Sequence, residues 1–398
     1  MIFNVGADSG VENNIIVRKD KNLCLKDAVP SVLKVNTLDG ESVQNGTPTP
    51  SVPVDIKSVV VSELKTTGKN LWSYGNASGT RYVAKNIMLD AGTYTVSALV
   101  TSSDTDSTES TMIFNYDDGL TLALHFTRNS RKSRKATFTK PVVSVNLYAS
   151  NNYANSTNDT FTWSDIQIEK GEVASGYESY KETKATLSTP ITLRGIGDIK
   201  DILCKQDGVY GVLRKNKHRI FNGIESGWSL QSINSYGVAN FLYTLSDSNV
   251  NNGLNPLLNN RFQKQDTGIS GTTSEGIYLN DKHAMYVRLS QDKASTVEGF
   301  KTWLSGNNLE VVYMLANSTF EPLPEADQLA LKQLETFEKL TYVFTDSEIE
   351  PAIEVEYAKS KTGGLLFDVE NNLGGCFFKY ENGKFYIGHE EETTVTEV

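Results

Sequence analysis

The feature of this chain that most constrains its fold is a two-residue alternation of apolar and polar side chains, repeated in short segments between turns. In AGTYTVSALV, apolar side chains occupy every second position from Tyr94 to Val100. PVVSVNLYAS repeats the pattern from Val143 to Ala149. Because alternate side chains of a strand point to opposite faces, such segments form half-buried strands. Regular spacing of these strands indicates two packed sheets, so we predict an all-β, sandwich-type fold.

TMIFNYDDGLTLALHF predicts a β-hairpin. Asp118 and Gly119 favour a type I′ turn between its arms, because this pair tolerates positive φ angles. The second arm places its apolar side chains on one face: Leu120, Leu122, Leu124 and Phe126.

The segment TFTWSDIQIEKGEVASGYESY is predicted to be the last strand of the same sandwich and its exit. Ile166 and Ile168 point into the core, and Gly171 supplies the permissive corner at the rim. Tyr177 and Tyr180 then lie back across the sandwich edge, with their rings buried and their hydroxyls in water.

Two segments predict helices. VEGFKTWLSG is expected to form a short helix that ends at Gly306. PEADQLALKQLETF is the clearest helical pattern, because Pro324 suits a first turn and acidic residues follow it. Its apolar stripe consists of Ala326, Leu329, Ala330, Leu334 and Phe337.

The 398 residues are enough for two or three domains. We expect an extended amino-terminal attachment segment over residues 1–60, because its prolines disfavour sheet ladders. A β-sandwich module is predicted for residues 61–182. A second sandwich module with the short helices follows over residues 183–357. Residues 358–398 are predicted as a small β extension of two hairpins, one turned at ENG, with an acidic tail.

The formal net charge of −10 excludes a general nucleic-acid binder, which needs a basic face. Cys24, Cys204 and Cys376 are far apart and odd in number, so neither a disulfide framework nor a zinc site is expected. No segment approaches the ~20 apolar residues of a membrane span. The start MIFNVGADSG lacks the features of a signal peptide, which leads us to expect synthesis in the cytoplasm of the host cell.

Six segments together define a resemblance to a known family. They are GTPTPSVPVDIKSV, GKNLW, DIQIEKGEVASGYESY, GVYGVLRKNKHRIFNGIESGW, GFKTWLSGNNLEVVYMLA and LPEADQLALKQLETF. In this order they cover roughly residues 30–357, and the chain resembles minor structural or tail-fibre proteins of phages that infect Gram-positive bacteria.

The resemblance implies tandem jelly-roll sandwiches like carbohydrate-binding modules, in a virion component at the tail tip or baseplate. It implies other tail and baseplate proteins as partners, and host cell-wall polysaccharide or teichoic acid as the surface bound. We expect no enzyme activity, no cofactor, no metal and no membrane insertion. A homotrimer or another symmetric multimer is expected, because weak sugar contacts gain from avidity. The last 40 residues match no part of the family.

Aromatic rings are the natural candidates for sugar binding, because the apolar face of a pyranose stacks on a ring. Core packing is the alternative for each of them. His125 joins the candidates because it lies opposite the leucines of its strand. The carbohydrate-binding candidates are Trp72, Tyr74, Tyr82, Tyr116, His125, Tyr148 and Trp163. Trp163 points away from the face of Ile166 and Ile168 unless a β-bulge intervenes.

The stretch RNSRKSRK is a candidate contact for an anionic polymer or a neighbouring subunit. Its basic residues are Arg128, Arg131, Lys132, Arg134 and Lys135. A solvated loop is the alternative. SDTDSTES has Asp104 and Asp106 where a calcium loop would have them, but Glu109 and Asn115 break the motif. Two further readings of the whole chain stay open: a pure tail scaffold without a ligand, and a wall polysaccharide depolymerase.

Overall fold

The computed structural model consists mostly of antiparallel β-strands, with two short helices in the part of the chain that it describes. This confirms the predicted all-β class. The described residues are 11–18, 22–152, 158–249, 257–264, 273–280 and 282–360, and four short strands beyond them.

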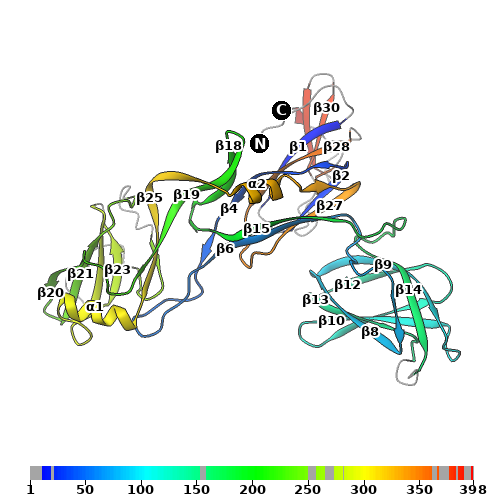
Figure 1. The fold of residues 1–398 in the computed structure, drawn as a ribbon, viewed down its shortest axis with the longest axis horizontal. Helices are drawn as coiled ribbons and strands as arrows, with labels where there is room; N and C mark the ends of the chain where they lie inside the picture. Colours follow the sequence, from blue (N-terminus) through cyan, green and yellow to red (C-terminus); the bar gives the residue numbers. More distant parts are fainter. Residues whose placement is uncertain are drawn as a thin grey trace.

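Three separate hydrophobic cores organise the described chain, and Figure 1 shows the corresponding three bodies side by side. The central body has a core that runs from Leu23 to Tyr357 along the chain. The first sandwich has its core between Trp72 and Ile168. The second module has its core between Phe221 and Tyr313. Both of these bodies are therefore inserted into the sequence of the central body.

The central body is built on one long sheet, which continues into the second module. In order, its strands are β15 (Glu182–Leu193), β6 (Lys57–Thr67), β27 (Lys339–Thr345), β2 (Asn22–Ala28), β28 (Ile353–Ser360), β4 (Lys34–Asp39), β18 (Ile202–Gln206), β19 (Val209–Phe221), β25 (Leu309–Pro322) and β22 (Leu257–Asn259). Beside this path lie β1 (Val11–Arg18) on β28 and β5 (Ser42–Val43) on β6. Two small ladders pair β3 (Ser31–Val32) with β26 (Glu335–Thr336), and β16 (Gly195–Ile196) with β17 (Ile199–Lys200).

The first sandwich packs two four-stranded sheets face to face. One sheet has the order β11 (Thr121–Thr127), β10 (Glu109–Tyr116), β13 (Val142–Tyr148) and β8 (Tyr82–Leu89). The other has the order β12 (Lys132–Phe138), β9 (Gly92–Ser102), β14 (Thr160–Lys170) and β7 (Ala77–Thr80). Ile166 and Ile168 are buried between the sheets, and Gly171 turns the corner with φ +114°, as predicted.

The second module packs a four-stranded sheet and helix α1 against the far ends of β19 and β25. The sheet has the order β20 (Ser229–Ile233), β21 (Val238–Thr244), β24 (Ala284–Ser290) and β23 (Gly276–Leu279). Helix α1 (Val297–Gly306) starts at Thr296, whose side chain accepts a hydrogen bond from the Gly299 backbone N–H, and ends as predicted.

The predicted domain boundaries need correction. Residues 1–60 do not form a separate extended segment, because Leu33, Val35 and Leu38 are buried in the central core and β4 pairs with both β28 and β18. Residues 183–357 do not form one sandwich either. Their strands are divided between the central body and the second module, since β19 contributes side chains to both cores, whereas β25 contributes to the core of the second module.

Two local predictions were also wrong in part. Helix α2 (Glu325–Leu331) is shorter than the predicted helix, and Thr336 near the end of that segment belongs to a strand instead. Leu329, which was predicted to lie in the apolar stripe, is 52% exposed. The β10–β11 hairpin forms, but only Gly119 of the turn pair has a positive φ, so the turn is not type I′. The turn is instead closed by a hydrogen bond from the Tyr116 N–H to the Leu120 carbonyl.

In the carboxy-terminal stretch the described backbone pairs β30 (Cys376–Glu381) with β31 (Lys384–His389) as a hairpin. The short strands β29 (Leu365–Leu366) and β32 (Thr396–Glu397) add to it. The predicted ENG turn and the acidic segment after His389 fall largely outside the described residues.

Candidate functional site

Three of the predicted sugar-binding aromatics are core residues, which corrects their assignment. Trp72 is 1% exposed, Tyr116 8% and Trp163 0%. All three belong to the hydrophobic core of the first sandwich. A pyranose cannot reach a ring that is enclosed by both sheets, so these residues stabilise the module rather than bind a glycan.

A β-bulge explains why Trp163 lies in the core. The pairing of β14 with β9 shifts register between Ser164 and Gln167, and Asp165 has φ +50°. The extra residue turns Trp163 to the same face as Ile166. The indole N–H of Trp163 donates to the Tyr148 carbonyl over 3.3 Å, which satisfies its polar atom.

Tyr74 and Tyr82 are exposed, at 41% and 47%. Tyr74 lies at the edge of β8: its ring packs edge-on against Trp72, its hydroxyl donates to the Asn86 carbonyl, and the Lys85 ammonium is 5.1 Å from its ring centre. Tyr82 instead stacks on Tyr148, with ring centres 5.2 Å apart.

The stacked tyrosines begin a row of side chains across the outer face of the β11–β10–β13–β8 sheet. We call this surface the open face. Tyr82 pairs with Tyr148 across β8 and β13. On β10 and β11, Thr111 pairs with His125, and their side chains are 2.9 Å apart between the hydroxyl and Nδ1. His125 is exposed, so this end of the face presents an aromatic pair and an imidazole.

Two further rows complete the open face. The next row consists of the register partners Ala84, Asn146, Ile113 and Ala123. The row after it consists of Asn86, Ser144, Asn115 and Thr121. Rows two residues apart along a strand are separated by about 7 Å. The middle row therefore places Asn146 and Ile113 at its centre and alanines at its two edges, between the aromatic row and an amide-rich row.

The outer face of the opposite sheet is covered at one end. Gln167 and Glu169 are 0% and 4% exposed, although they point away from the core. The chain that leaves β14 folds over them: the Ser175 N–H and hydroxyl both donate to Glu169, and the Glu178 N–H donates to Gln167 Oε1. This cover lies over the end of the face that holds Gln167 and Glu169, whereas Ser78, Thr101 and Thr160 toward its other end are exposed.

The basic stretch does not form a cationic patch. Arg128 is 9% exposed, and its guanidinium donates to the Asp104 carboxylate over 2.6 Å. It also donates to Ser110 Oγ and to four backbone carbonyls, those of Asp104, Ser107, Glu109 and Ala149. Arg128 therefore fixes the loop before β10, and its assignment as a polymer contact was wrong.

The ion pair of Arg128 also determines the state of Asp104. Burial alone raises the pKa of this carboxyl, but hydrogen bonds from Ser150 and Arg128 outweigh burial and lower the pKa. The loop thus holds an arginine where the sequence pattern allowed a calcium ion, and the described residues contain no cluster of three or more acidic, histidine or cysteine side chains that could bind a metal.

The other basic side chains point in different directions. Arg131 lies 5.7 Å from the ring centre of Tyr177, Lys135 pairs with Glu172 over 2.5 Å, and the Arg134 Nε–H donates to the His125 carbonyl over 2.7 Å. Lys132 is half-buried at the end of β12. These residues form separate contacts within the chain, and they do not gather into one surface for a polyanion.

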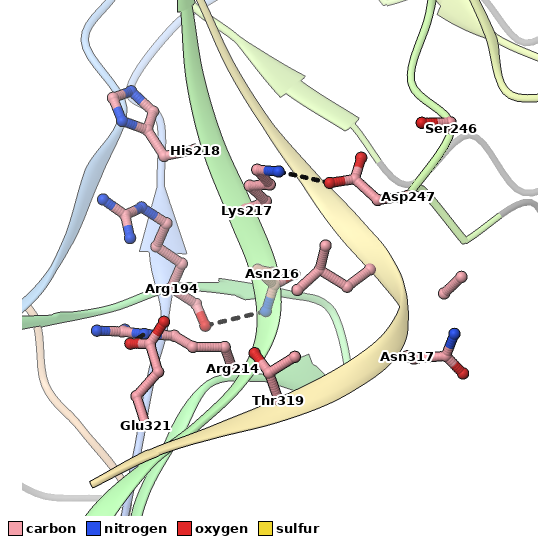
Figure 2. Close-up of a pocket in the computed structure, with 12 residues that line it drawn as sticks. Arg194, Arg214, Asn216, Lys217, His218, Ser246, Asp247, Asn317, Thr319 and Glu321 are labelled. Carbon is pink, nitrogen blue, oxygen red and sulfur yellow. Dashed lines mark hydrogen bonds and ion pairs between the residues drawn. The ribbon is translucent and has the colours of Figure 1, made fainter.

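The structure adds a site that the sequence did not indicate, a hollow of about 680 Å³ on the ribbon of β19 and β25. At this place residues 315–318 of β25 stand opposite Lys215 alone, so β25 bulges away from β19. The bulge is held by the loop after β21, where the Ala316 N–H donates to the Asp247 carbonyl. Arg194, at the end of β15, lines the opposite side (Figure 2).

The segments GKNLW and DIQIEKGEVASGYESY form a joint between the first sandwich and the central sheet. Asn70, in GKNLW, is 2% exposed and donates to the carbonyls of Ile166 and Glu178. Its Oδ1 accepts from the N–H groups of Trp72 and Ile168. GKNLW and DIQIEKGEVASGYESY thus lock together at the point where the first sandwich leaves the central sheet.

The sequence reasoning named Tyr82, Tyr148 and His125, but it missed the polar residues between them. Ser144 and Asn146 were present as the polar half of the alternation in β13, so the signal was available. The hollow had no such signal, because its walls come from four separate segments of the chain.

Comparisons with protein-family models, with curated proteins and with solved structures found no match to this chain. Among the described residues, no helix has the length and apolar character needed to cross a membrane.

Proposed function

We propose that this chain is a structural protein of the tail tip or baseplate of a tailed phage of Gram-positive bacteria. The proposal is supported by the ordered motifs of the family resemblance and by the all-β architecture of a hub with two inserted modules. Its work is attachment and assembly without covalent chemistry. We propose symmetric multimers with other tail proteins as neighbours.

The open face of the first sandwich is the proposed attachment surface for cell-wall glycan. The observation that supports this choice is the stacked pair of Tyr82 and Tyr148, with the amide of Asn146 in the next row and that of Asn115 in the row after it. A sugar offers an apolar ring face and several hydroxyls, so a binding surface needs aromatic and amide groups within a few ångströms of each other.

The test is binding of the purified protein to isolated host walls. The double variant Tyr82→Ala/Tyr148→Ala is expected to bind about tenfold more weakly or worse, because aromatic contacts dominate such surfaces. Trp72→Ala is unsuitable, since it would open a cavity in the core. Tyr236→Ala is the matched control, because this tyrosine is 58% exposed in the other module. Unchanged binding by a folded double variant would contradict attachment through the open face.

A pure connector is the second candidate. One observation favours it: the segments GKNLW and DIQIEKGEVASGYESY build the joint around Asn70. In that case wall binding should be absent from the wild type as well. A depolymerase is separable from both, because it alone would release reducing sugar from the walls.

A further inference from the structure

The hollow on the β19–β25 ribbon combines charged and polar groups from four parts of the chain. Its polar lining residues include Arg194, Arg214, Asn216, Lys217, His218, Asp247 and Glu321. Figure 2 shows Arg194 and His218 on the same side of β19, while Lys217 extends toward Asp247. The hollow lies outside the first sandwich, so its properties are independent of the open face.

Most charges in the hollow are paired. Arg214 donates to Glu321 over 2.7 Å and to the buried Asp201 over 3.3 Å. Lys217 pairs with Asp247 over 2.5 Å. These pairs leave little net charge to attract a further ion, and they fix the walls of the hollow.

Arg194 is different. Its backbone is bound to Asp201 and Asn216, but among the described residues its guanidinium has no hydrogen bond and no ion pair within 4 Å. The group is half-buried, and burial lowers the pKa of Arg194. The charges of Asp201 and Glu321 act the other way and raise this pKa, but neither carboxylate forms an ion pair with the guanidinium, so its N–H donors can bind an anion in the hollow.

Two neighbours of Arg194 have spare hydrogen-bonding capacity. Asn216 is 3% exposed, and its Oδ1 is buried without a partner, while its Nδ2 donates to the carbonyls of Arg194 and Ile199. Burial, and after it the charge of Arg194, lower the pKa of His218, although the Glu310 carboxylate, 3.5 Å from its Nε2, acts in the opposite direction; the neutral imidazole keeps Nδ1 for a ligand. A neutral imidazole and an unpaired amide oxygen both suit a ligand hydroxyl.

We propose that the hollow binds a small anion that also carries hydroxyl groups, such as a phosphorylated sugar, with its negative group on Arg194 and its hydroxyls toward Asn216 and His218. A volume of about 680 Å³ accommodates one sugar with its phosphate.

The experiment is isothermal titration calorimetry of the full chain with glucose 1-phosphate, inorganic phosphate and glucose. Glucose 1-phosphate is expected to bind more tightly than either of its halves. In Arg194→Gln its affinity should fall about tenfold or more, because a charge-assisted hydrogen bond is lost. The variant should fold, since the side chain of Arg194 makes none of the hydrogen bonds that hold β15. Lys332→Gln, which removes an exposed positive charge outside the hollow, is the control and should bind like the wild type.

Absent binding of glucose 1-phosphate, or equal binding by Arg194→Gln, would overturn the site. Inorganic phosphate that binds as tightly as glucose 1-phosphate would overturn the requirement for hydroxyls. A further titration with a glucose phosphodiester separates two sources of the ligand. Binding of the diester supports a phosphate-linked polymer as the occupant, and binding of the monoester alone supports a free sugar phosphate. The difference between the wild type and Arg194→Gln reports the hollow alone, because this substitution leaves the open face of the first sandwich unchanged.

Discussion

The two inserted bodies leave the central sheet through joints of different construction. At the first joint the ladder of β6 and β15 ends at the pair Thr67 and Glu182, and the chain continues without strand pairing. At the second joint β19 runs from the central core into the core of the second module, paired with β25 on both sides of the bulge at residues 315–318. Figure 1 shows this long ribbon on one side of the central body and the first sandwich on the other.

Side chains replace the backbone ladder at the first joint. Asn70 makes four hydrogen bonds there, and the Lys69 ammonium donates to Ser175 Oγ and the Gly176 carbonyl, both over 2.8 Å. Lys69 is only 6% exposed. A joint without paired strands therefore keeps its geometry through a buried polar network in which nearly every group has a partner.

At the second joint the ladder persists, and the bulge in it is stabilised from both sides. Asp201, 0% exposed, accepts the backbone N–H groups of Arg194, Lys215 and Asn216. The proline-rich segment before β6 also spans this joint, where the Arg261 guanidinium donates to the Pro50 carbonyl and the Val54 N–H to the Asn260 carbonyl. The comparison teaches that the first joint depends on a network of side-chain hydrogen bonds. The second depends on a two-stranded ribbon and on the buried carboxylate of Asp201 beside it.

We expect the largest loss of stability from a substitution that disrupts the second joint. Asp201→Ala leaves three buried N–H groups without an acceptor and removes a partner of Arg214. We expect a loss of roughly 3–5 kcal/mol in the free energy of unfolding, because each buried N–H left without an acceptor costs about 1–3 kcal/mol. Denaturant titration measures it. Asp198→Ala is the control, because Asp198 is exposed three residues earlier. Equal midpoints for the two variants would refute the role of Asp201.

We expect the next largest loss of stability from a substitution that disrupts the first joint. Asn70→Ala leaves two carbonyls and two N–H groups unpaired in a buried site, at a cost of about 2–4 kcal/mol. Because the exit chain packs over the covered face through this network, trypsin should cleave faster at Lys170 and Lys181. The exposed Asn76→Ala is the control. A wild-type cleavage rate in Asn70→Ala would show that the joint does not depend on this side chain.

The sequence predicted the strands of both joints but not the joints themselves. Period-two patterns in β9, β13 and β19 were visible because alternation is a local property. The insertion of one body into another was not visible in the sequence. β4 pairs with β28 more than three hundred residues away, and the sequence of neither strand indicates its partner. For the same reason Arg128 looked like a surface residue: its counter-ion, Asp104, lies in a different loop.

The smallest expected effect is a dependence of stability on pH at the second joint, which comes from Asp247. Burial alone would raise the pKa of Asp247, but hydrogen bonds from Lys217 and Tyr313 outweigh it and lower the pKa below 3.8. A depressed carboxyl pKa contributes stability that is complete above the unfolded-state value and is lost as the pH falls through the folded-state value. The side chain of Asp247 is 40% exposed, so screening limits this contribution to less than about 1 kcal/mol.

Asp247→Asn should therefore be slightly less stable than the wild type near pH 6, and the difference should vanish below about pH 3. Thermal melts at a series of pH values measure it, with the exposed Asp292→Asn in the same module as the control. The first joint, whose network includes Lys69 and Asn70, provides the contrast: Asn70→Ala should show the same loss at both pH values, because an amide does not titrate. A pH-independent deficit in Asp247→Asn would mean that the loop holds the bulge by packing and not by charge.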